Sequence, residues 1–324
     1  MFLTPDRAKI AQMPQLHVQL ILAGHRSLKN KELDVSVSRQ HSGRIKSEGE
    51  WRAMETACLD ELDFGTLSTV DLLGTGVEMF TAGSGDPLLF LHGIDGLEGS
   101  AAVLRELAKT FTVHAPSHPG FGNSQRPARL DRVDDLGYFY LDLMAQLGLD
   151  RPVVVGISFG GWVAAETLTK EPARAAQLVL VSPLGLPTAD RRVQHVADIF
   201  MLSRQELGKR MQVGAPEPGS DMAVLTKLPE ERIRRLMRND EAASLYGWTP
   251  YMSNPKLADR LHRISTPTLM LWGDSDAIVS AAYRERWRAA LPQAEVETIA
   301  EAGHRIHADQ PAALAARIAA FAGR

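Results

Sequence analysis

The stretch Gly156-Ile157-Ser158-Phe159-Gly160-Gly161 contains a serine in the pattern Gly-x-Ser-x-Gly. An apolar run rich in valine precedes it at residues 152–155, and a helical pattern begins after it at residues 162–166. Between a strand and a helix, this motif holds the serine in a strained turn that projects its hydroxyl above a sheet. It therefore predicts a nucleophilic Ser158. The alternative is a tight turn whose serine only caps the helix.

Strand-like and helix-like patterns alternate on both sides of this motif. Apolar runs typical of strands occupy residues 76–81, 87–91, 111–115, 152–157, 178–182, 267–272 and 296–299. Helical patterns occupy residues 99–109, 131–147, 160–170, 281–291 and 311–321. Several of the strands are apolar on both faces, which is typical of a parallel sheet covered by helices on both sides. The pattern predicts an α/β fold with a mostly parallel, doubly wound sheet.

The alternation is interrupted between about residues 184 and 263. Helical patterns at residues 198–211 and 229–238 flank a Gly/Pro-rich loop at residues 214–219, and no strand-like run occurs there. A helical excursion between two strands of a parallel sheet indicates an inserted cap. We therefore expect a core formed by residues 54–185 and 257–324, with a helical cap at residues 186–256.

The first 53 residues differ in composition from the remainder. They carry nine Lys or Arg against five Asp or Glu, whereas the whole chain has a net charge of −3. Residues 26–51 are polar and show neither a helical nor a strand period. Such a segment buries too little apolar surface to offset the entropy lost on ordering. We expect residues 1–53 to be a poorly ordered or loosely packed extension, and Met54 is a candidate alternative start of translation.

Bulk composition excludes several classes of function. The chain has 324 residues, of which 44% are hydrophobic, which is enough for a full core. The net charge of −3 gives no electrostatic indication that the chain binds nucleic acid. A single cysteine, Cys58, permits no internal disulfide, and no metal-binding Cys/His spacing occurs. No apolar run is long enough to span a membrane. We expect a cytoplasmic protein without cofactor or metal that acts on a small molecule; nothing in the sequence indicates its oligomeric state.

A second glycine-rich motif, His92-Gly93-Ile94-Asp95-Gly96, follows the predicted strand at residues 87–91. Acyl transfer needs two backbone N–H groups directed at the developing oxyanion. Phe159, directly after the nucleophile, is the candidate for one. Ile94 is the candidate for the other, because Gly93 lets the backbone approach a ligand. His92 is predicted to hold the loop by hydrogen bonds; an ordinary glycine-rich turn is the alternative.

Candidates for an acid and a base follow the last two strands. Asp276 lies beyond the end of the predicted strand at residues 267–272, and His304 follows the predicted strand at residues 296–299. The order Ser, Asp, His along the chain is that of α/β-hydrolase triads. Asp274 competes with Asp276, but it lies closer to the strand end, where it could cap the turn. His307 competes with His304.

These motifs together resemble the α/β-hydrolase superfamily over about residues 67–323. The resemblance rests on HGIDG (92–96), HPGFGNS (118–124), GISFGG (156–161), GDSDAIV (273–279) and AGHRIHADQP (302–311). It implies a catalytic triad of Ser158, Asp276 and His304, with an oxyanion hole from Ile94 and Phe159. It also implies a cap that covers the site and sets specificity. The candidates for the substrate pocket are Trp248, Tyr251 and Ile278, although Trp248 and Tyr251 could equally pack the cap internally.

The resemblance implies a serine hydrolase that cleaves a small-to-medium, moderately hydrophobic carboxylic ester through an acyl-enzyme. Epoxide hydrolases and dehalogenases of this fold use an aspartate nucleophile, whereas position 158 is serine. Meta-cleavage-product hydrolases, which break carbon–carbon bonds, are the alternative; they usually carry tryptophan directly after the catalytic histidine, where this chain has Arg305. A third hypothesis is a non-catalytic receptor on the same fold.

Overall fold

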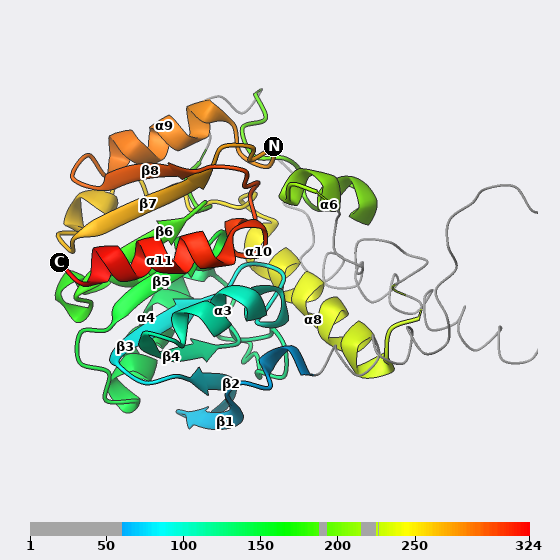
Figure 1. The fold of residues 1–324 in the computed structure, drawn as a ribbon. Coiled ribbons are helices and arrows are strands. Elements are labelled where there is room, and N and C mark those ends of the chain that lie inside the picture. Colours follow the sequence, from blue (N-terminus) through cyan, green and yellow to red (C-terminus); the bar gives the residue numbers. More distant parts are fainter. Residues whose placement is uncertain (1–59, 188–192, 215–224, 226) are drawn as a thin grey trace, which may run out of the picture. The chain divides into compact units, whose positions relative to one another are not determined.

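The computed structural model describes residues 60–187, 193–214, 225 and 227–324. The predicted extension at residues 1–53 lies outside them, as does most of the predicted loop at residues 214–219. The described residues contain an eight-stranded sheet in the order β1-β2-β4-β3-β5-β6-β7-β8. Neighbouring strands are parallel from β4 through β3, β5, β6 and β7 to β8, whereas β2 pairs antiparallel with both β1 and β4 at one edge. The predicted mostly parallel α/β fold is therefore confirmed (Figure 1).

The seven strands expected from apolar runs are all present. Their bounds, together with those of the strand that the sequence did not reveal, are β1 Thr66–Leu72, β2 Thr75–Ala82, β3 Asp86–Leu91, β4 Phe111–Pro116, β5 Val153–Ile157, β6 Gln177–Val181, β7 Thr268–Gly273 and β8 Glu295–Ile299. The unpredicted strand, β1, lies at the edge and is mostly exposed on both faces. An edge strand of this kind has no buried face, so its sequence carries no apolar alternation.

The five helices expected in the core are also present. Their bounds are α3 Ala101–Leu107, α4 Val133–Gln146, α5 Phe159–Lys170, α9 Ala281–Ala290 and α11 Pro311–Ala322, and the short α10 Ile306–Asp309 precedes the last of them. Short 3-10 turns lie at Asp60–Leu62, Glu98–Ser100, Pro172–Arg174 and Leu261–Arg263.

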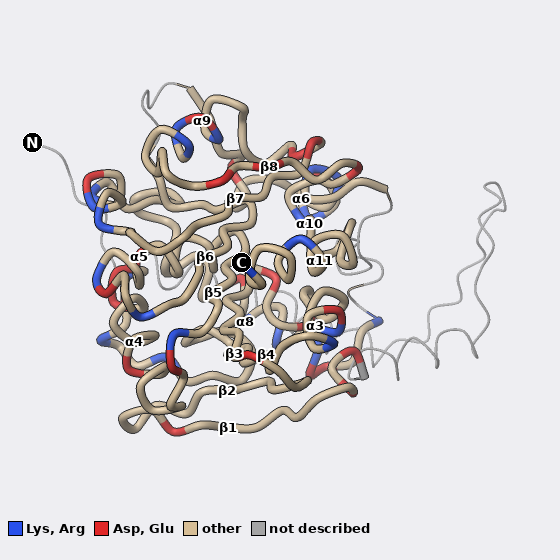
Figure 2. Tube along the Cα trace, turned by 60° about the vertical axis from the view of Figure 1, so that its left-hand side comes forward, with Lys and Arg blue, Asp and Glu red and all other residues tan. Residues whose placement is uncertain are grey.

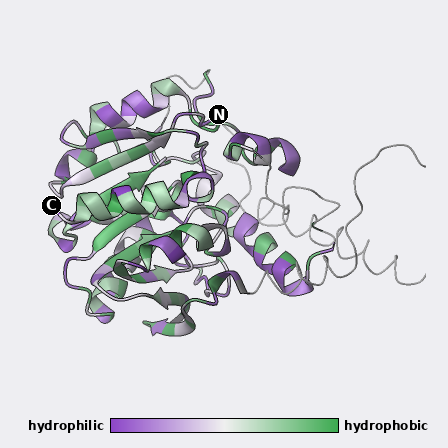
Figure 3. Cartoon of the chain, in the orientation of Figure 1, coloured by the Kyte–Doolittle hydropathy of each residue, from purple (hydrophilic) through white to green (hydrophobic). Residues whose placement is uncertain are grey.

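The helices cover the sheet on both faces. Leu88 and Phe90 of β3 pack with residues of α3 and α11, whereas Leu89 and Leu91 of the same strand pack with residues of α4, α5 and α9. Successive side chains of a strand point to opposite faces, so an uninterrupted apolar run supplies both cores at once. In Figure 3 the strands of the sheet are accordingly mainly hydrophobic.

The described part of the segment between β6 and β7 contains two longer helices, α6 Arg204–Met211 and α8 Glu230–Gly247. The helix predicted at residues 198–211 begins later than expected, because the Ser203 side chain accepts the N–H of Glu206 and caps it there. The helix predicted at residues 229–238 continues for nine residues more, because Ala242, Ala243 and Tyr246 of its last turns are buried. That this segment forms a separate cap stays a prediction.

The charges of the described residues do not gather on one face. In Figure 2 the blue and red segments are interspersed over the outer helices and loops, and β5 and β6 carry neither colour. Within the same residues, no helix is both long and apolar enough to cross a membrane.

Candidate active site

Ser158 occupies the turn between β5 and α5. Its backbone has a φ of 52° and a ψ of −110°, a region that non-glycine residues occupy only under constraint. Its N–H donates to the carbonyl O of Val181 at 2.8 Å, and its own carbonyl O accepts the N–H groups of Trp162 and Leu184. The turn is thus tied to β6, to α5 and to the segment after β6. These bonds set the direction in which the Ser158 hydroxyl projects.

Two glycines of the motif let other backbone segments reach this turn. A Cβ atom on Gly160 would lie 2.0 Å from the carbonyl O of Leu91, and one on Gly156 would lie 2.4 Å from the carbonyl O of Gly160. Neither position accepts a side chain without moving backbone. The loop after β3 consequently packs on the first turn of α5, where a Cβ on Gly93 would lie 3.7 Å from the Cβ of Ser158.

His304 lies between Ser158 and Asp276. Its Nε2 is 2.9 Å from the Oγ of Ser158, and its Nδ1 is 2.9 Å from the Oδ2 of Asp276. All three residues are buried. Since an ionised carboxylate can only accept, Nδ1 carries the hydrogen, and Nε2 is left to accept the serine proton. This arrangement can transfer a proton from the hydroxyl to the imidazole.

The second oxygen of Asp276 is also engaged. Its Oδ1 accepts the N–H groups of Ile278 at 2.9 Å and Val279 at 3.1 Å. Burial alone would raise the pKa of Asp276, but His304 and these two amides outweigh burial and lower the pKa below its ordinary value. The carboxylate therefore stays ionised beside the imidazole at neutral pH.

The competing residues have other partners. Asp274 accepts the N–H groups of Glu301 and Ala302, so it holds the loop that leads to His304 and does not contact the imidazole. His307 places its Nε2 3.2 Å from the Oδ2 of Asp95. Of the competing candidates, His304 is thus the histidine that contacts Ser158, and Asp276 is the aspartate that contacts His304.

His92 holds the loop after β3, as predicted from the sequence. The N–H of His118 donates to the Nε2 of His92 at 3.0 Å, so Nδ1 carries the hydrogen, and it donates to the carbonyl O of Gly93 at 2.6 Å. Burial lowers the pKa of His92 to about 4, which keeps this ring neutral at physiological pH. The ring of His118 in turn contacts the hydroxyl of Tyr140 and donates from Nε2 to the carbonyl O of His92 at 2.9 Å.

These bonds orient the peptide between Gly93 and Ile94. The carbonyl O of Gly93 accepts the N–H of Gly96 at 3.3 Å in addition to the hydrogen bond from His92. In a planar trans peptide the N–H points opposite to the C=O, so fixing the Gly93 carbonyl also fixes the Ile94 N–H. Among the described residues, none accepts a hydrogen bond from the N–H of Ile94 or of Phe159. Phe159 is the first residue of α5, where N–H groups lack partners within the helix.

The three predicted pocket residues lie in different surroundings. Ile278 is buried and its N–H is held by Asp276. The hydroxyl of Tyr251 accepts the N–H of Ile199 and donates to the carbonyl O of Ala197. Trp248 is 42% exposed, and its ring contacts Phe200 at a centroid distance of 5.5 Å. These contacts of Trp248 and Tyr251 fit packing within the segment between β6 and β7; their place in a substrate pocket stays a prediction.

The loop carrying His304 also contacts the end of α6. The N–H of Arg305 donates to the carbonyl O of Met211 at 2.8 Å, and a Cβ on Gly303 would lie 2.9 Å from the Cα of Gln212. The sequence singled out neither this contact nor the side chain of Asp95, although Asp95 lies inside the predicted oxyanion loop. Within the described residues, no group of three or more His, Cys, Asp or Glu is arranged to hold a metal ion.

Known proteins are similar to this chain in sequence. The chain is 30% identical over 230 residues to the dihydrolipoyllysine-residue acetyltransferase component of the acetoin cleaving system of Cupriavidus necator; the match covers 68% of this chain and 59% of that protein. It is 27% identical over 245 residues to the sn-1-specific diacylglycerol lipase ABHD11 of Mus musculus, covering 69% of this chain and 76% of the lipase.

A solved structure of a membrane phospholipase A, described as a bacterial virulence factor, superposes with a TM-score of 0.70 at 21% identity, over 95% of this chain and 97% of that one. This likeness shows the fold. Residues 86–311 match the family described as alpha/beta hydrolase fold. The chain therefore belongs to the α/β hydrolase fold family.

Proposed function

We propose that the chain is a serine hydrolase that cleaves a small-to-medium, moderately hydrophobic carboxylic ester through an acyl-enzyme. The observation that carries this proposal is the pair of 2.9 Å contacts that link the Oγ of Ser158 through His304 to Asp276. Hydrogen bonds of this length, in this order, activate a serine hydroxyl for attack on an acyl carbon.

In the proposed reaction the Oγ of Ser158 attacks the ester carbonyl while the Nε2 of His304 takes the hydroxyl proton. The N–H groups of Ile94 and Phe159 stabilise the oxyanion of the tetrahedral intermediate. The intermediate collapses when His304 returns the proton to the departing alkoxide, which leaves an acyl group on Ser158. Water then attacks the acyl-enzyme with His304 again as base, and the carboxylic acid is released. Asp276 keeps the imidazole in the required tautomer throughout.

An ester substrate is supported by the surroundings of Ser158 and by the relatives. The side chains of Phe159 and Ile278 are apolar and buried, and Ile94 packs against the same core. One relative is a diacylglycerol lipase and one solved structure of the same fold is a phospholipase A, and both of these enzyme classes cleave carboxylic esters. Apolar surroundings favour an acyl chain over a highly charged group.

The proposal is tested with p-nitrophenyl esters of increasing acyl length, from acetate to decanoate, beside the Ser158→Ala variant. We expect saturable hydrolysis, a preference for acyl chains of short to intermediate length, and a loss of about 10⁴-fold or more in the variant. Activity that persists in folded Ser158→Ala would refute the nucleophile.

A fluorophosphonate probe separates the remaining hypotheses. Labelling of Ser158 without ester hydrolysis would direct the search to carbon–carbon bond cleavage, which uses the same serine and histidine. A folded protein whose Ser158 reacts with neither probe nor ester would instead be a non-catalytic binding protein. Labelling together with ester hydrolysis supports the proposal.

A further inference from the structure

Asp95 links the loop after β3 to the loop that carries His304. Its Oδ2 lies 2.7 Å from an Nη of Arg305 and 3.2 Å from the Nε2 of His307. Arg305 directly follows His304 in the chain, and it is 8% exposed. Burial alone would raise the pKa of Asp95, but Arg305 and His307 outweigh burial and hold it well below its ordinary value. Asp95 therefore faces Arg305 as a carboxylate.

The same carboxylate packs on its own loop. A Cβ on Gly93 would lie 2.8 Å from the Oδ1 of Asp95, and one on Gly99 would lie 2.6 Å from its Oδ2. The carboxylate thus packs against Gly93. The peptide bond between Gly93 and Ile94 carries the N–H of Ile94. His92 fixes the plane of that peptide through its hydrogen bond to the Gly93 carbonyl. Asp95 instead contacts Arg305, on the loop that carries His304.

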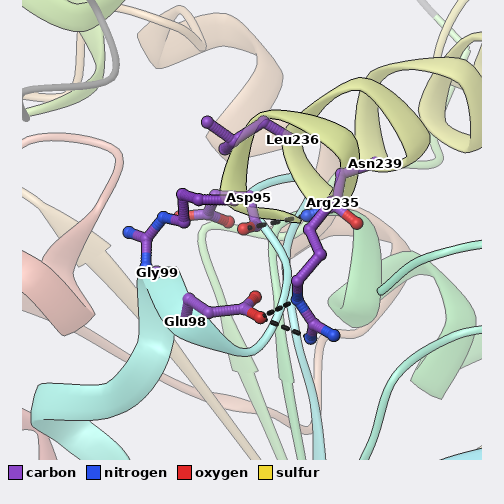
Figure 4. A pocket seen from close by; sticks show the side chains of 7 residues that line it. Asp95, Glu98, Gly99, Arg235, Leu236 and Asn239 are labelled. Carbon is purple, nitrogen blue, oxygen red and sulfur yellow. Dashed lines mark hydrogen bonds and ion pairs between the residues drawn. The ribbon is translucent and has the colours of Figure 1, made fainter. Parts of the chain in front are cut away.

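Helix α8 also holds the loop after β3, through Asn239. The Nδ2 of Asn239 donates to the carbonyl O of Asp95 at 3.3 Å, and its Oδ1 accepts the N–H of Gly122 at 2.9 Å. Figure 4 shows Asp95 and Asn239 at one side of a small cavity, with the ion pair of Glu98 and Arg235 at the other. The cavity holds about 40 Å³, room for a few waters at about 12 Å³ each and too little for a substrate.

We propose that Asp95 is a positioning residue for the hydrolysis, which through its ion pair with Arg305 sets the N–H of Ile94 relative to the imidazole of His304. This inference rests on the proposed serine hydrolase function. The two groups must act on the same tetrahedral intermediate, one on its oxyanion and one on its proton. They lie on loops that are 212 residues apart in sequence at the Asp95–His307 contact. The salt bridge joins the two loops directly, so it restricts the distance between them.

The test uses the variants Asp95→Asn, Arg305→Met and Arg305→Lys. Active sites are counted first, by titration with an irreversible phosphonate, so that misfolded protein does not enter the rates. Then kcat and KM are measured on a p-nitrophenyl ester. The affinity for a trifluoromethyl ketone, which forms an oxyanion-bearing adduct with a serine hydroxyl, is compared with that for the methyl ketone of the same chain. Arg317→Met, which removes the ion pairs of Arg317 with Glu297 and Glu295, is the matched control.

For Asp95→Asn and Arg305→Met we expect kcat to fall about tenfold or more, with KM within about twofold. Affinity for the trifluoromethyl ketone should fall by the same factor as kcat/KM, while that for the methyl ketone is retained. Arg305→Lys keeps the charge and should recover most of the loss, and Arg317→Met should match the native protein. Because Arg305→Lys retains a cation that Arg305→Met lacks, the two variants test the ion pair even if Asp95→Asn does not fold.

Native kcat and native affinity for the trifluoromethyl ketone in titrated Arg305→Met would overturn the proposal, since Asp95 and Arg305 would then only stabilise the fold. Equal losses in Arg305→Lys and Arg305→Met would also overturn it. Failure of the proposed function would instead appear as a native protein that does not hydrolyse esters, or as activity that persists in Ser158→Ala. The two failures are therefore distinguishable.

Discussion

The Nδ1 of His304 lies 2.9 Å from the Oδ2 of Asp276, while the other oxygen of that carboxylate accepts the N–H groups of Ile278 and Val279. Both oxygens of Asp276 are thus engaged, one by the imidazole and one by the backbone that follows β7. This anchoring fixes the carboxylate before any substrate arrives, and it fixes the tautomer of His304 in turn.

The variant Asp276→Asn should lose activity while it remains folded. An amide in this position can present its NH₂ to Nδ1 and so favours the wrong tautomer, in which Nε2 carries the hydrogen and cannot accept the serine proton. We expect kcat to fall by roughly 10³–10⁴-fold. The measurement is steady-state ester hydrolysis normalised by active-site titration. Asp274→Asn is the comparison: its side chain is exposed and bonds only to loop groups, so its loss should stay below about tenfold.

The substitution Gly160→Ala should disrupt the contact between the serine turn and the loop after β3. The new Cβ would lie 2.0 Å from the carbonyl O of Leu91, so backbone must move. We expect a cost of at least about 2 kcal/mol in unfolding free energy and a loss of most ester hydrolysis. Gly76→Ala is a suitable control, because its Cβ meets nothing closer than 3.5 Å. Denaturant unfolding and ester hydrolysis of both variants check the prediction; equal behaviour of the two would contradict it.

Loss of Arg235 from its ion pair with Glu78 should lower the free energy of unfolding more than loss of an arginine from a surface pair of α8. Two nitrogens of Arg235 lie 2.7 and 2.9 Å from the two oxygens of Glu78, and both side chains are nearly fully buried. Removing one partner strands a buried charge, so Arg235→Met should lower the free energy of unfolding by about 3 kcal/mol or more.

The neighbouring Arg234 provides the control for that variant. Its side chain is 58% exposed and pairs with Glu230 and Glu231 within the same helix. Arg234→Met should change the free energy of unfolding by no more than about 0.5 kcal/mol. Urea titrations of the two variants give the comparison. Similar losses in both would mean that burial does not govern the strength of the Arg235 pair.

His92 should give the stability of the protein a pH dependence of known sign. Its pKa is about 4 in the folded protein, against about 6.5 in an unfolded chain. Between these values the unfolded chain binds a proton that the folded protein does not, so acidification destabilises. The contribution of neutral His92 is complete above about pH 6.5 and is lost as the pH falls toward 4, at up to about 1.4 kcal/mol per pH unit.

This prediction is checked by measuring the free energy of unfolding at pH 7, 6 and 5 for the native protein and for His92→Gln. The variant loses the hydrogen bond to the Gly93 carbonyl and should be less stable at every pH. Its stability should nevertheless fall less steeply between pH 6.5 and 5, because it lacks the titrating ring. Parallel slopes would show that His92 does not contribute to the acid sensitivity.

The parts of this protein that were predictable from sequence have local causes. Apolar runs on both faces predict buried parallel strands, and Gly156 and Gly160 beside Ser158 predict a turn into which other backbone must fit. Strand β1 escaped prediction because it lies exposed at the sheet edge, where no pattern of burial is imposed. The last turns of α8 escaped it because the burial of Ala242, Ala243 and Tyr246 extends that helix, and burial depends on the fold.

What the sequence determined by itself was the set of residues and their order: a serine in a strand-to-helix turn, an aspartate and a histidine after later strands, and the glycines that let the loops approach. Tertiary structure decided which of them meet. Asp276 and Asp274 are two residues apart, yet only Asp276 contacts His304, and Asp95 finds Arg305 on a loop more than 200 residues away. Such pairings depend on strand order and loop direction, because a sheet places the ends of distant strands side by side. No local pattern encodes that neighbourhood.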